Sequence, residues 1–184
     1  MILTKENTEV LIAKCRNHDR NAQLEIYNRF YKAMFNTSYR IVKNQAEAED
    51  IMQDAFLTAF TKLSSLESDS MFVAWLKRIV VNASLTALKK NNKYEEVALE
   101  AVDYKVSDDT YEMSADEMSN LKVNSVLESL KQLKTSYSTI LSLYLIEGYD
   151  YDEIAKIMNI SYSNCRTLVS RAKQSLKRKI LITH

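Results

Sequence analysis

The chain has a single glycine, Gly148, and no proline among its 184 residues. Tight hairpin turns depend on these two residue types, because glycine adopts left-handed backbone conformations and proline presets a turn. The apolar residues also recur at spacings of three and four, the period of an amphipathic helix, rather than two. The sequence therefore predicts an all-α protein.

The charged residues divide the chain into three parts. Residues 1–92 hold 13 basic and 10 acidic side chains, residues 93–120 hold 2 and 9, and residues 121–184 hold 10 and 5. The apolar residues of the middle part have no sustained period, which is typical of a flexible linker. We expect two small helical domains, 1–92 and 121–184, that bind nucleic acid at two places. The acidic linker is either a solvated loop with a little helix or a mimic of nucleic acid in a partner's basic channel.

Most kinds of chemical site are missing from the sequence. Cys15 and Cys165 have no CxxC neighbour, and one glycine cannot make a glycine-rich phosphate loop. We therefore expect no enzymatic activity, metal, cofactor or small-molecule substrate. Apolar runs such as ILSLYLI are too short to cross a bilayer, and the first ten residues do not resemble a signal peptide. We expect a cytoplasmic protein without direct membrane insertion.

The first domain is predicted to start with helices at 9–16 and 22–42, the second capped by Asp19. A third helix should begin near Ala46. Its apolar positions form one continuous stripe, which predicts a buried face: Ala48, Ile51, Met52, Ala55, Phe56, Ala59, Phe60 and Leu63.

The opposite face of this third helix carries Asp50, Gln53, Asp54 and Leu57, at spacings of i, i+3, i+4 and i+7. A leucine ringed by polar groups favours a protein contact, although single exposed leucines are common in soluble proteins and need no special reason. Both interpretations stay open on the pattern alone.

A fourth helix is predicted within residues 71–90, with one apolar and one basic face. The expected buried stripe is Phe72, Leu76, Ile79, Val80, Ala83 and Leu88, and the side chains left to water or a ligand are Lys77, Arg78, Asn82, Lys89 and Lys90. Cations beside aromatic rings suit single-stranded nucleic acid. Phe72 and Trp75 nevertheless fit the core better than a stacking role, because they lie on or beside the apolar stripe.

Residues 150–179 have the pattern of a helix-turn-helix. Asp150 and Glu153 are spaced as a capping box, which would begin the first helix of the motif at a defined residue. Asn159 occupies the turn, where a left-handed conformation is needed, and Ser161 is the expected N-cap of the second helix. Backbone amides of Tyr162 to Asn164 could then hold a phosphate at the helix N-terminus.

The second helix of the motif carries six basic residues and no acid. With Leu168, Ala172 and Leu176 as its buried edge, the side chains left for the major groove are Ser163, Asn164, Arg166, Thr167, Ser170, Arg171 and Lys173. We expect Asn164 and Arg166 to contact bases, and Arg171 and Lys173 to contact phosphates. The cluster 177–179 is expected to be a solvated basic end.

Two stretches together resemble an extracytoplasmic-function (ECF) sigma factor of the sigma-70 family, the bacterial subunits that recruit RNA polymerase to promoters. The first, residues 24–90, contains AEAEDIMQDAFLTAF followed by FVAWLKRIVVN. The second, residues 130–180, contains EGYDYDEIAKIMNIS and SRAKQSLK and is similar to region four of the family. These segments in this order are more specific to the family than EIAKIMNIS alone, because many helix-turn-helix regulators contain a segment similar to EIAKIMNIS.

The resemblance implies that Asp50, Gln53, Asp54 and Leu57 bind core RNA polymerase at the clamp helices of its largest subunit. It implies that the loop 66–71 captures a flipped base of the minus-ten promoter element. The minus-ten contacts would come from Leu66, Ser68, Asp69, Ser70, Phe72, Lys77, Arg78 and Asn82. The minus-thirty-five contacts would come from Ser161, Tyr162, Ser163, Asn164, Arg166, Thr167, Ser170, Arg171 and Lys173. An anti-sigma factor is a further implied partner.

The sequence departs from the family at a few positions. Leu66, Glu67 and Ser68 stand where members commonly have an aromatic residue, Arg and Gly, so the base preference is open. Lys134 replaces a common proline at the start of the second domain, where Thr135 or Ser136 could cap the helix instead. Ser138 replaces a common arginine, so that a phosphate contact expected there would be missing.

The alternative is an ordinary helix-turn-helix regulator whose N-terminal domain serves dimerisation or sensing. Such a protein would bind symmetric half-sites in duplex DNA without RNA polymerase. The polar face around Gln53 distinguishes the two hypotheses, because only a sigma factor would need it to bind polymerase.

Overall fold

The structure is a computed structural model that describes residues 5–98 and 119–183. Within these ranges every regular element is helical, and the chain divides into two compact units, Met1–Lys89 and Lys90–His184. The predicted all-α architecture with two helical domains is confirmed. Most of the predicted linker 93–120 lies outside the described residues, and the boundaries 1–92 and 121–184 stay predictions.

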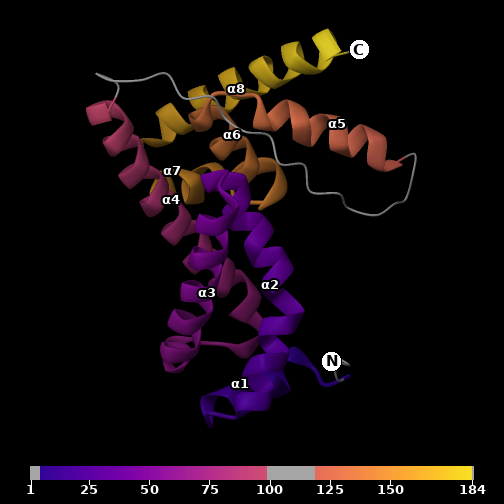
Figure 1. Cartoon of the computed structure of the whole chain (residues 1–184), viewed down its shortest axis with the longest axis vertical. Helices are drawn as coiled ribbons and strands as arrows, with labels where there is room; N and C mark the ends of the chain where they lie inside the picture. Colours follow the sequence, from indigo (N-terminus) through magenta and orange to yellow (C-terminus); the bar gives the residue numbers. More distant parts are fainter. Residues whose placement is uncertain (1–4, 99–118, 184) are drawn as a thin grey trace. The chain divides into compact units, whose positions relative to one another are not determined.

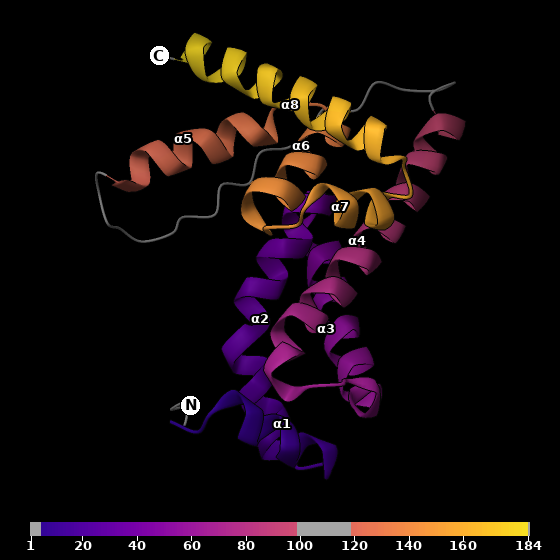
Figure 2. The same cartoon turned by 180° about the vertical axis from the view of Figure 1, so that it is seen from behind.

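The N-terminal unit is built on three long helices and one short one. These are α1 (Thr8–Arg16), α2 (Arg20–Val42), α3 (Gln45–Thr61) and α4 (Phe72–Ala98), with the 3-10 turns η1 (Leu63–Ser65) and η2 (Asp69–Met71) before α4. The helices α2, α3 and α4 run alternately in opposite directions, and α1 lies at the end where α2 begins (Figures 1 and 2). The predicted cap is confirmed, since Asp19 accepts hydrogen bonds from the amides of Asn21 and Ala22 at 2.9 and 3.1 Å.

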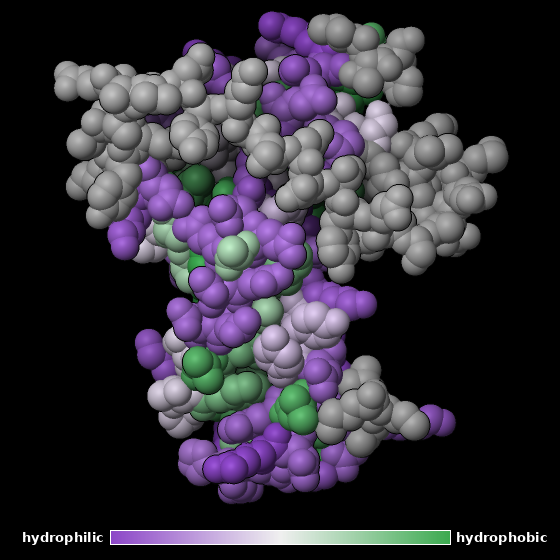
Figure 3. Space-filling view, in the orientation of Figure 1, coloured by the Kyte–Doolittle hydropathy of each residue, from purple (hydrophilic) through white to green (hydrophobic). Residues whose placement is uncertain are grey.

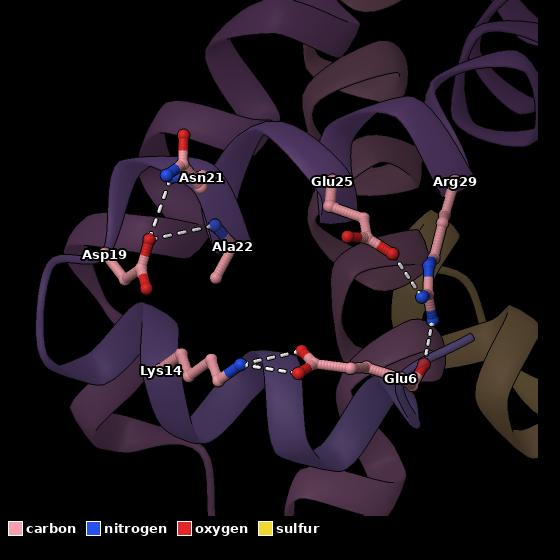
Figure 4. A network of polar contacts seen from close by, with 7 residues as sticks. All are labelled: Glu6, Lys14, Asp19, Asn21, Ala22, Glu25 and Arg29. Atoms are coloured by element: carbon pink, nitrogen blue, oxygen red, sulfur yellow. Dashed lines mark hydrogen bonds and ion pairs between the residues drawn. The ribbon is translucent and has the colours of Figure 1, made fainter. Parts of the chain in front are cut away.

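Polar contacts hold α1 in place beside α2 (Figure 4). Lys14 pairs with Glu6, with its Nζ 2.7 Å from Oε1, and Arg29 of α2 donates to the Glu6 carbonyl at 2.7 Å while it pairs with Glu25. Leu11 and Ile12 add burial, at 2% and 0% exposure. Both buried apolar side chains and polar contacts thus hold α1 in place.

The core of the N-terminal unit joins all four helices through aromatic and aliphatic side chains. Phe72 of α4 contacts Phe30 of α2 with ring centroids 6.4 Å apart, and Tyr27 of α2 contacts Phe56 of α3 at 5.0 Å. The predicted stripe of α3 is buried at Ala48, Met52, Ala55, Phe56, Ala59 and Leu63, and half-buried at Ile51 and Phe60. The predicted inner face of α3 is therefore confirmed.

The buried face of α4 differs from the prediction. Val81, Ser84 and Leu85 are buried, whereas Ile79, Ala83 and Leu88 are only partly so. Ser84 is tolerated because its hydroxyl has two partners within hydrogen-bond distance, the Val80 carbonyl at 2.8 Å and Ser38 Oγ of α2 at 2.9 Å. The prediction used apolar residues only and therefore left out Ser84. As a result, the predicted buried face is rotated around the helix relative to the observed one. The helix also continues to Ala98, beyond its predicted end.

By length and composition, the helical stretch Asp69–Asn91 could also cross a membrane, which the shorter apolar runs in the sequence did not suggest. Phe72, Leu76 and Val80 in this stretch are fully buried in the N-terminal unit. Burial in the core thus accounts for part of the hydropathy of α4. Around this core, the visible surface is mostly hydrophilic, with hydrophobic patches in between (Figure 3).

The C-terminal unit consists of α5 (Ser119–Lys131), α6 (Thr135–Leu141), the π-helical turn η3 (Ser142–Ile146), α7 (Tyr151–Met158) and α8 (Tyr162–Thr183). The last helix, α8, packs against α5, α6 and α7. The buried core of the C-terminal unit includes Ile140, Leu141, Leu143, Ile154, Cys165, Val169 and Ala172. The helix α6 begins after Lys134 without a side-chain cap, so the prediction that Thr135 or Ser136 caps it is wrong.

Candidate polymerase and DNA interfaces

The first candidate interface is the exposed face of α3 formed by Asp50, Gln53, Asp54 and Leu57, called here the α3 polar face. All four side chains are exposed, and Leu57 is 66% exposed. Within the described residues neither carboxylate has an ion-pair partner, so both remain available to cations on another molecule. An exposed leucine between free carboxylates has the composition of a protein contact with a polar rim.

The second candidate interface is the loop 66–71, which connects η1 to α4 through η2. Arg16, at the last turn of α1, contacts the first residue of this loop and its middle. The Arg16 Nη1 lies 2.5 Å from Asp69 Oδ1, and its Nη2 donates to the Leu66 carbonyl at 3.2 Å. Between these points, the hydroxyl oxygens of Ser68 and Ser70 are 2.9 Å apart.

A polar pocket of about 350 Å³ opens where this loop meets α1. Its lining residues are Glu9, Arg16, Glu67, Ser68, Asp69 and Ser70. Sequence reasoning missed Glu9 and Arg16, because nothing in a pattern links the first helix to a loop about fifty positions later.

The structure corrects the expected role of two minus-ten residues. Leu66 is 7% exposed and Phe72 is fully buried, and both belong to the core of the N-terminal unit. In this conformation neither side chain can stack on a base, so they support the loop from beneath. Ser68 and Ser70 are exposed and Asp69 is half-buried, which leaves these three at the pocket.

The basic face of α4 lies on the surface as predicted. Arg78, Asn82, Lys89 and Lys90 are exposed, and Lys77 is half-buried. Side chains at such positions can reach a phosphate backbone. Trp75 is half-buried and packs against Phe72, with ring centroids 6.2 Å apart, so it remains part of the core.

The third candidate interface is the helix-turn-helix, whose local chemistry is confirmed. Glu153 N donates to Asp150 Oδ1 at 2.8 Å, and Asp150 N donates to Glu153 Oε2 at 3.0 Å, which is the predicted capping box. Asn159 is left-handed at φ 56°, and Ser161 Oγ accepts from the Asn164 amide at 3.2 Å. Short-range hydrogen bonds thus set the turn between α7 and α8.

Removing the capping box should loosen α7 locally. We expect Asp150→Ala to lower the local unfolding free energy by about 1 kcal/mol, because the Glu153 amide loses its acceptor. In the full chain this corresponds to roughly fivefold faster hydrogen exchange of the α7 amides. Asp152→Ala, which changes a neighbouring exposed acid outside the box, is the matched control. Equal effects of the two substitutions would contradict a specific role of the box.

The outer face of α8 forms a shallow groove of about 570 Å³. Its lining residues are Tyr162, Ser163, Arg166, Thr167, Ser170, Arg171 and Gln174. The side chains predicted to face the major groove of DNA are all exposed, but Asn164 and Lys173 do not line this groove of the protein. Gln174 lines it and was not predicted. The buried edge includes Ala172 and Leu176 as predicted, whereas Leu168 is half-buried and Cys165 and Val169 complete it.

An aromatic cluster supports the N-terminal half of α8. The Tyr144 and Tyr151 rings stack with centroids 5.1 Å apart, and Tyr162 meets Tyr151 edge-on at 6.2 Å. Lys173 Nζ lies 4.3 Å from the Tyr144 ring centroid. A hydrogen bond from Tyr151, and then the charge of Lys173, lower the pKa of Tyr144. Lys173, predicted to contact phosphate, therefore also has a partner within the protein.

The two cysteines, Cys15 and Cys165, have free thiols. Both are buried, and burial raises the pKa of Cys15 to about 11 and also raises the pKa of Cys165. In the described part of the chain, no group of three His, Cys, Asp or Glu side chains could hold a metal ion.

Comparison with protein families matches the two units separately. The model of Sigma-70 region 2 matches residues 26–94, and that of Sigma-70, region 4 matches residues 124–176. The RNA polymerase sigma-H factor of Pseudomonas aeruginosa is 25% identical over 97% of this chain and 96% of its own length. The ECF RNA polymerase sigma factor SigW of Bacillus subtilis is 27% identical over 92% and 94%, respectively.

Solved structures share the fold. The sigma factor RpoE of Bartonella quintana, in complex with the anti-sigma factor NepR, superposes with a TM-score of 0.60 at 19% identity, covering 87% of this chain and 97% of that one. CnrH, in complex with the cytosolic domain of CnrY, gives a TM-score of 0.54 at 20% identity, covering 93% and 95%.

Proposed function

Because the chain belongs to the sigma-70 family, in its ECF group, we propose that it directs core RNA polymerase to specific promoters and assists DNA opening. The observation that supports this most directly is the order of the matches, with region 2 in the unit that carries the α3 polar face and region 4 in the unit that carries the helix-turn-helix. A protein of this kind acts by binding, without catalytic residues of its own, and works in the cytoplasm where the chromosome lies.

The three candidate interfaces have complementary tasks in this proposal. The α3 polar face binds the clamp helices of the largest polymerase subunit. The minus-ten element is bound by exposed and half-buried residues of the loop 66–71 and of α4, namely Ser68, Asp69, Ser70, Lys77, Arg78 and Asn82, with Leu66 and Phe72 as buried supports. The outer face of α8 binds the minus-thirty-five element through Asn164 and Arg166, with phosphate contacts around them.

A protein regulator completes the proposed set of partners. The solved structures of RpoE and CnrH each contain a second protein, and for RpoE that protein is an anti-sigma factor. We propose that an anti-sigma factor also holds this chain inactive. The exposed α3 polar face is a surface that such a regulator would have to cover in order to block polymerase.

The proposal is tested with the purified full chain and core RNA polymerase. Co-purification of the two, together with run-off transcripts from promoters selected out of a random DNA pool, is the expected result. Failure to bind core polymerase under conditions where a known sigma factor binds would refute it. The alternative, a regulator acting without polymerase, predicts sequence-specific duplex binding in the absence of core enzyme, and the region 2 match gives that alternative little support.

A further inference from the structure

We propose that Arg16 of α1 positions the loop 66–71, so that the first helix of the chain forms one wall of the pocket that receives the flipped minus-ten base. This inference rests on the proposed function and adds a residue that the region 2 match does not include, since that match begins at residue 26. The proposed role of Arg16 follows from its contacts with Leu66, where the loop begins, and with Asp69 in its middle.

A single guanidinium joins two points that lie three residues apart in the loop. Arg16 Nη1 meets the Asp69 carboxylate at 2.5 Å, and Arg16 Nη2 donates to the Leu66 carbonyl at 3.2 Å. Arginine suits this task because its planar fork presents several donors in fixed directions, whereas a lysine ammonium is a point charge on a flexible stem. The contact thus fixes the backbone at Leu66, just before the pocket-lining residues, and the side chain of Asp69 within the pocket lining.

The supporting helix is rigid enough to pass this restraint to the loop. The last two turns of α1 bury Ile12 and Cys15 in the core, at 0% and 2% exposure, and Lys14 is tied to Glu6 by its ion pair. Arg16 itself is only partly exposed, with 34% of its side chain accessible. A partly desolvated ion pair on a helix that is anchored in the core restrains its partners more strongly than a fully exposed pair.

Contacts other than those of Arg16 also hold the loop, and α1 packs against η2. Leu66 anchors it in the core, the Leu66 amide bonds to the Leu63 carbonyl at 3.2 Å, and the Met71 amide bonds to the Ser68 carbonyl at 3.0 Å. The segment Glu67 to Ser70 otherwise faces the pocket. A base entering the pocket would therefore meet Ser68 and Ser70 in positions that depend in part on Arg16.

The pocket also combines acidic and basic groups from two elements. Glu9 and Arg16 come from α1, and Glu67 and Asp69 come from the loop. Since Arg16 neutralises Asp69 by direct pairing, the carboxylate nearest the loop backbone is less repulsive to a DNA phosphate than it would be alone. Loss of Arg16 would therefore have two effects: it would release the loop, and it would leave the negative charge of Asp69 without its partner.

The first test measures the loop in the free full chain by hydrogen exchange. Arg16→Ala should accelerate exchange of the Leu66 and Met71 amides by about 10-fold, the amount expected when a charge-assisted hydrogen bond is lost. Arg16→Lys should restore little of the protection, because it cannot bridge both acceptors. Lys14→Ala is the matched control, since it removes an ion pair of the same helix that does not touch the loop. Unchanged exchange in Arg16→Ala would overturn the proposal.

The second test measures base selection. The same variants, combined with core RNA polymerase, transcribe a promoter pool with a randomised minus-ten element. Arg16→Ala should reduce discrimination at the captured position by about 10-fold while leaving polymerase binding intact. Wild-type discrimination in Arg16→Ala, or an equal loss in Lys14→Ala, would overturn the inference. If the wild-type chain yields no transcript at all, the proposed function fails, and the exchange rates alone decide whether Arg16 positions the loop.

Discussion

Replacing Asp54 with arginine should abolish binding of core RNA polymerase to this chain, with a loss on the order of 100-fold or more in affinity. The Asp54 carboxylate is exposed at the centre of the α3 polar face and has no ion-pair partner among the described residues. A charge reversal there removes an attraction to a basic partner and adds a repulsion, and like charges brought together at an interface cost several kcal/mol. Pulldown of core polymerase on the immobilised variant measures the effect.

Glu49→Arg is the matched control for this substitution. Glu49 is also an exposed acid on α3, but at about 100° per residue it lies to the side of the polar face rather than on it. Both changes are at the surface, so the folding free energy should shift by only a few tenths of a kcal/mol. Equal polymerase binding by Asp54→Arg and the wild-type chain would remove the α3 polar face from the proposed function. Equal losses in both variants would indicate a general charge effect instead.

The features that were predictable from the sequence are those determined over a few residues. The capping box of Asp150 and Glu153, the left-handed Asn159 and the Ser161 cap each depend on a side chain and a backbone group at most three positions apart. The exposed face of α3 was predictable for a similar reason, since helical periodicity separates it from the buried stripe.

Features determined by packing were missed or misplaced. Ser84 is buried because Ser38, on another helix, satisfies its hydroxyl, and no periodic pattern of apolar residues reports that. Leu66 was expected at a DNA-binding surface, whereas the fold turns it into the core. Arg16 was missed altogether, because its importance arises only when α1 meets a loop fifty positions further along the chain. Contacts between distant segments are therefore what the structure adds to the site.

Replacing Arg166 with alanine should weaken binding to a selected minus-thirty-five sequence by roughly 10- to 100-fold and relax the base preference at one position. Arg166 is exposed in the groove of α8, one turn from the N-terminus that Ser161 caps. At this position on a recognition helix, an arginine can donate two hydrogen bonds to the O6 and N7 atoms of guanine, which contribute about 1–3 kcal/mol of discrimination. Selection of duplex DNA by the polymerase-bound chain, followed by titration of wild-type and variant proteins, measures both effects.

Two further substitutions separate base reading from simple charge. Arg178→Ala removes the same side chain from an exposed position twelve residues later on α8, and should weaken binding slightly and equally for all sequences. Arg166→Lys keeps the charge but lacks the planar fork, so it should lose base preference while retaining more affinity than Arg166→Ala. A uniform loss across sequences in Arg166→Ala, with unchanged base preference and a shallower salt dependence, would instead assign Arg166 to a phosphate. Base reading would then have to come from Asn164 and other exposed side chains on the outer face of α8.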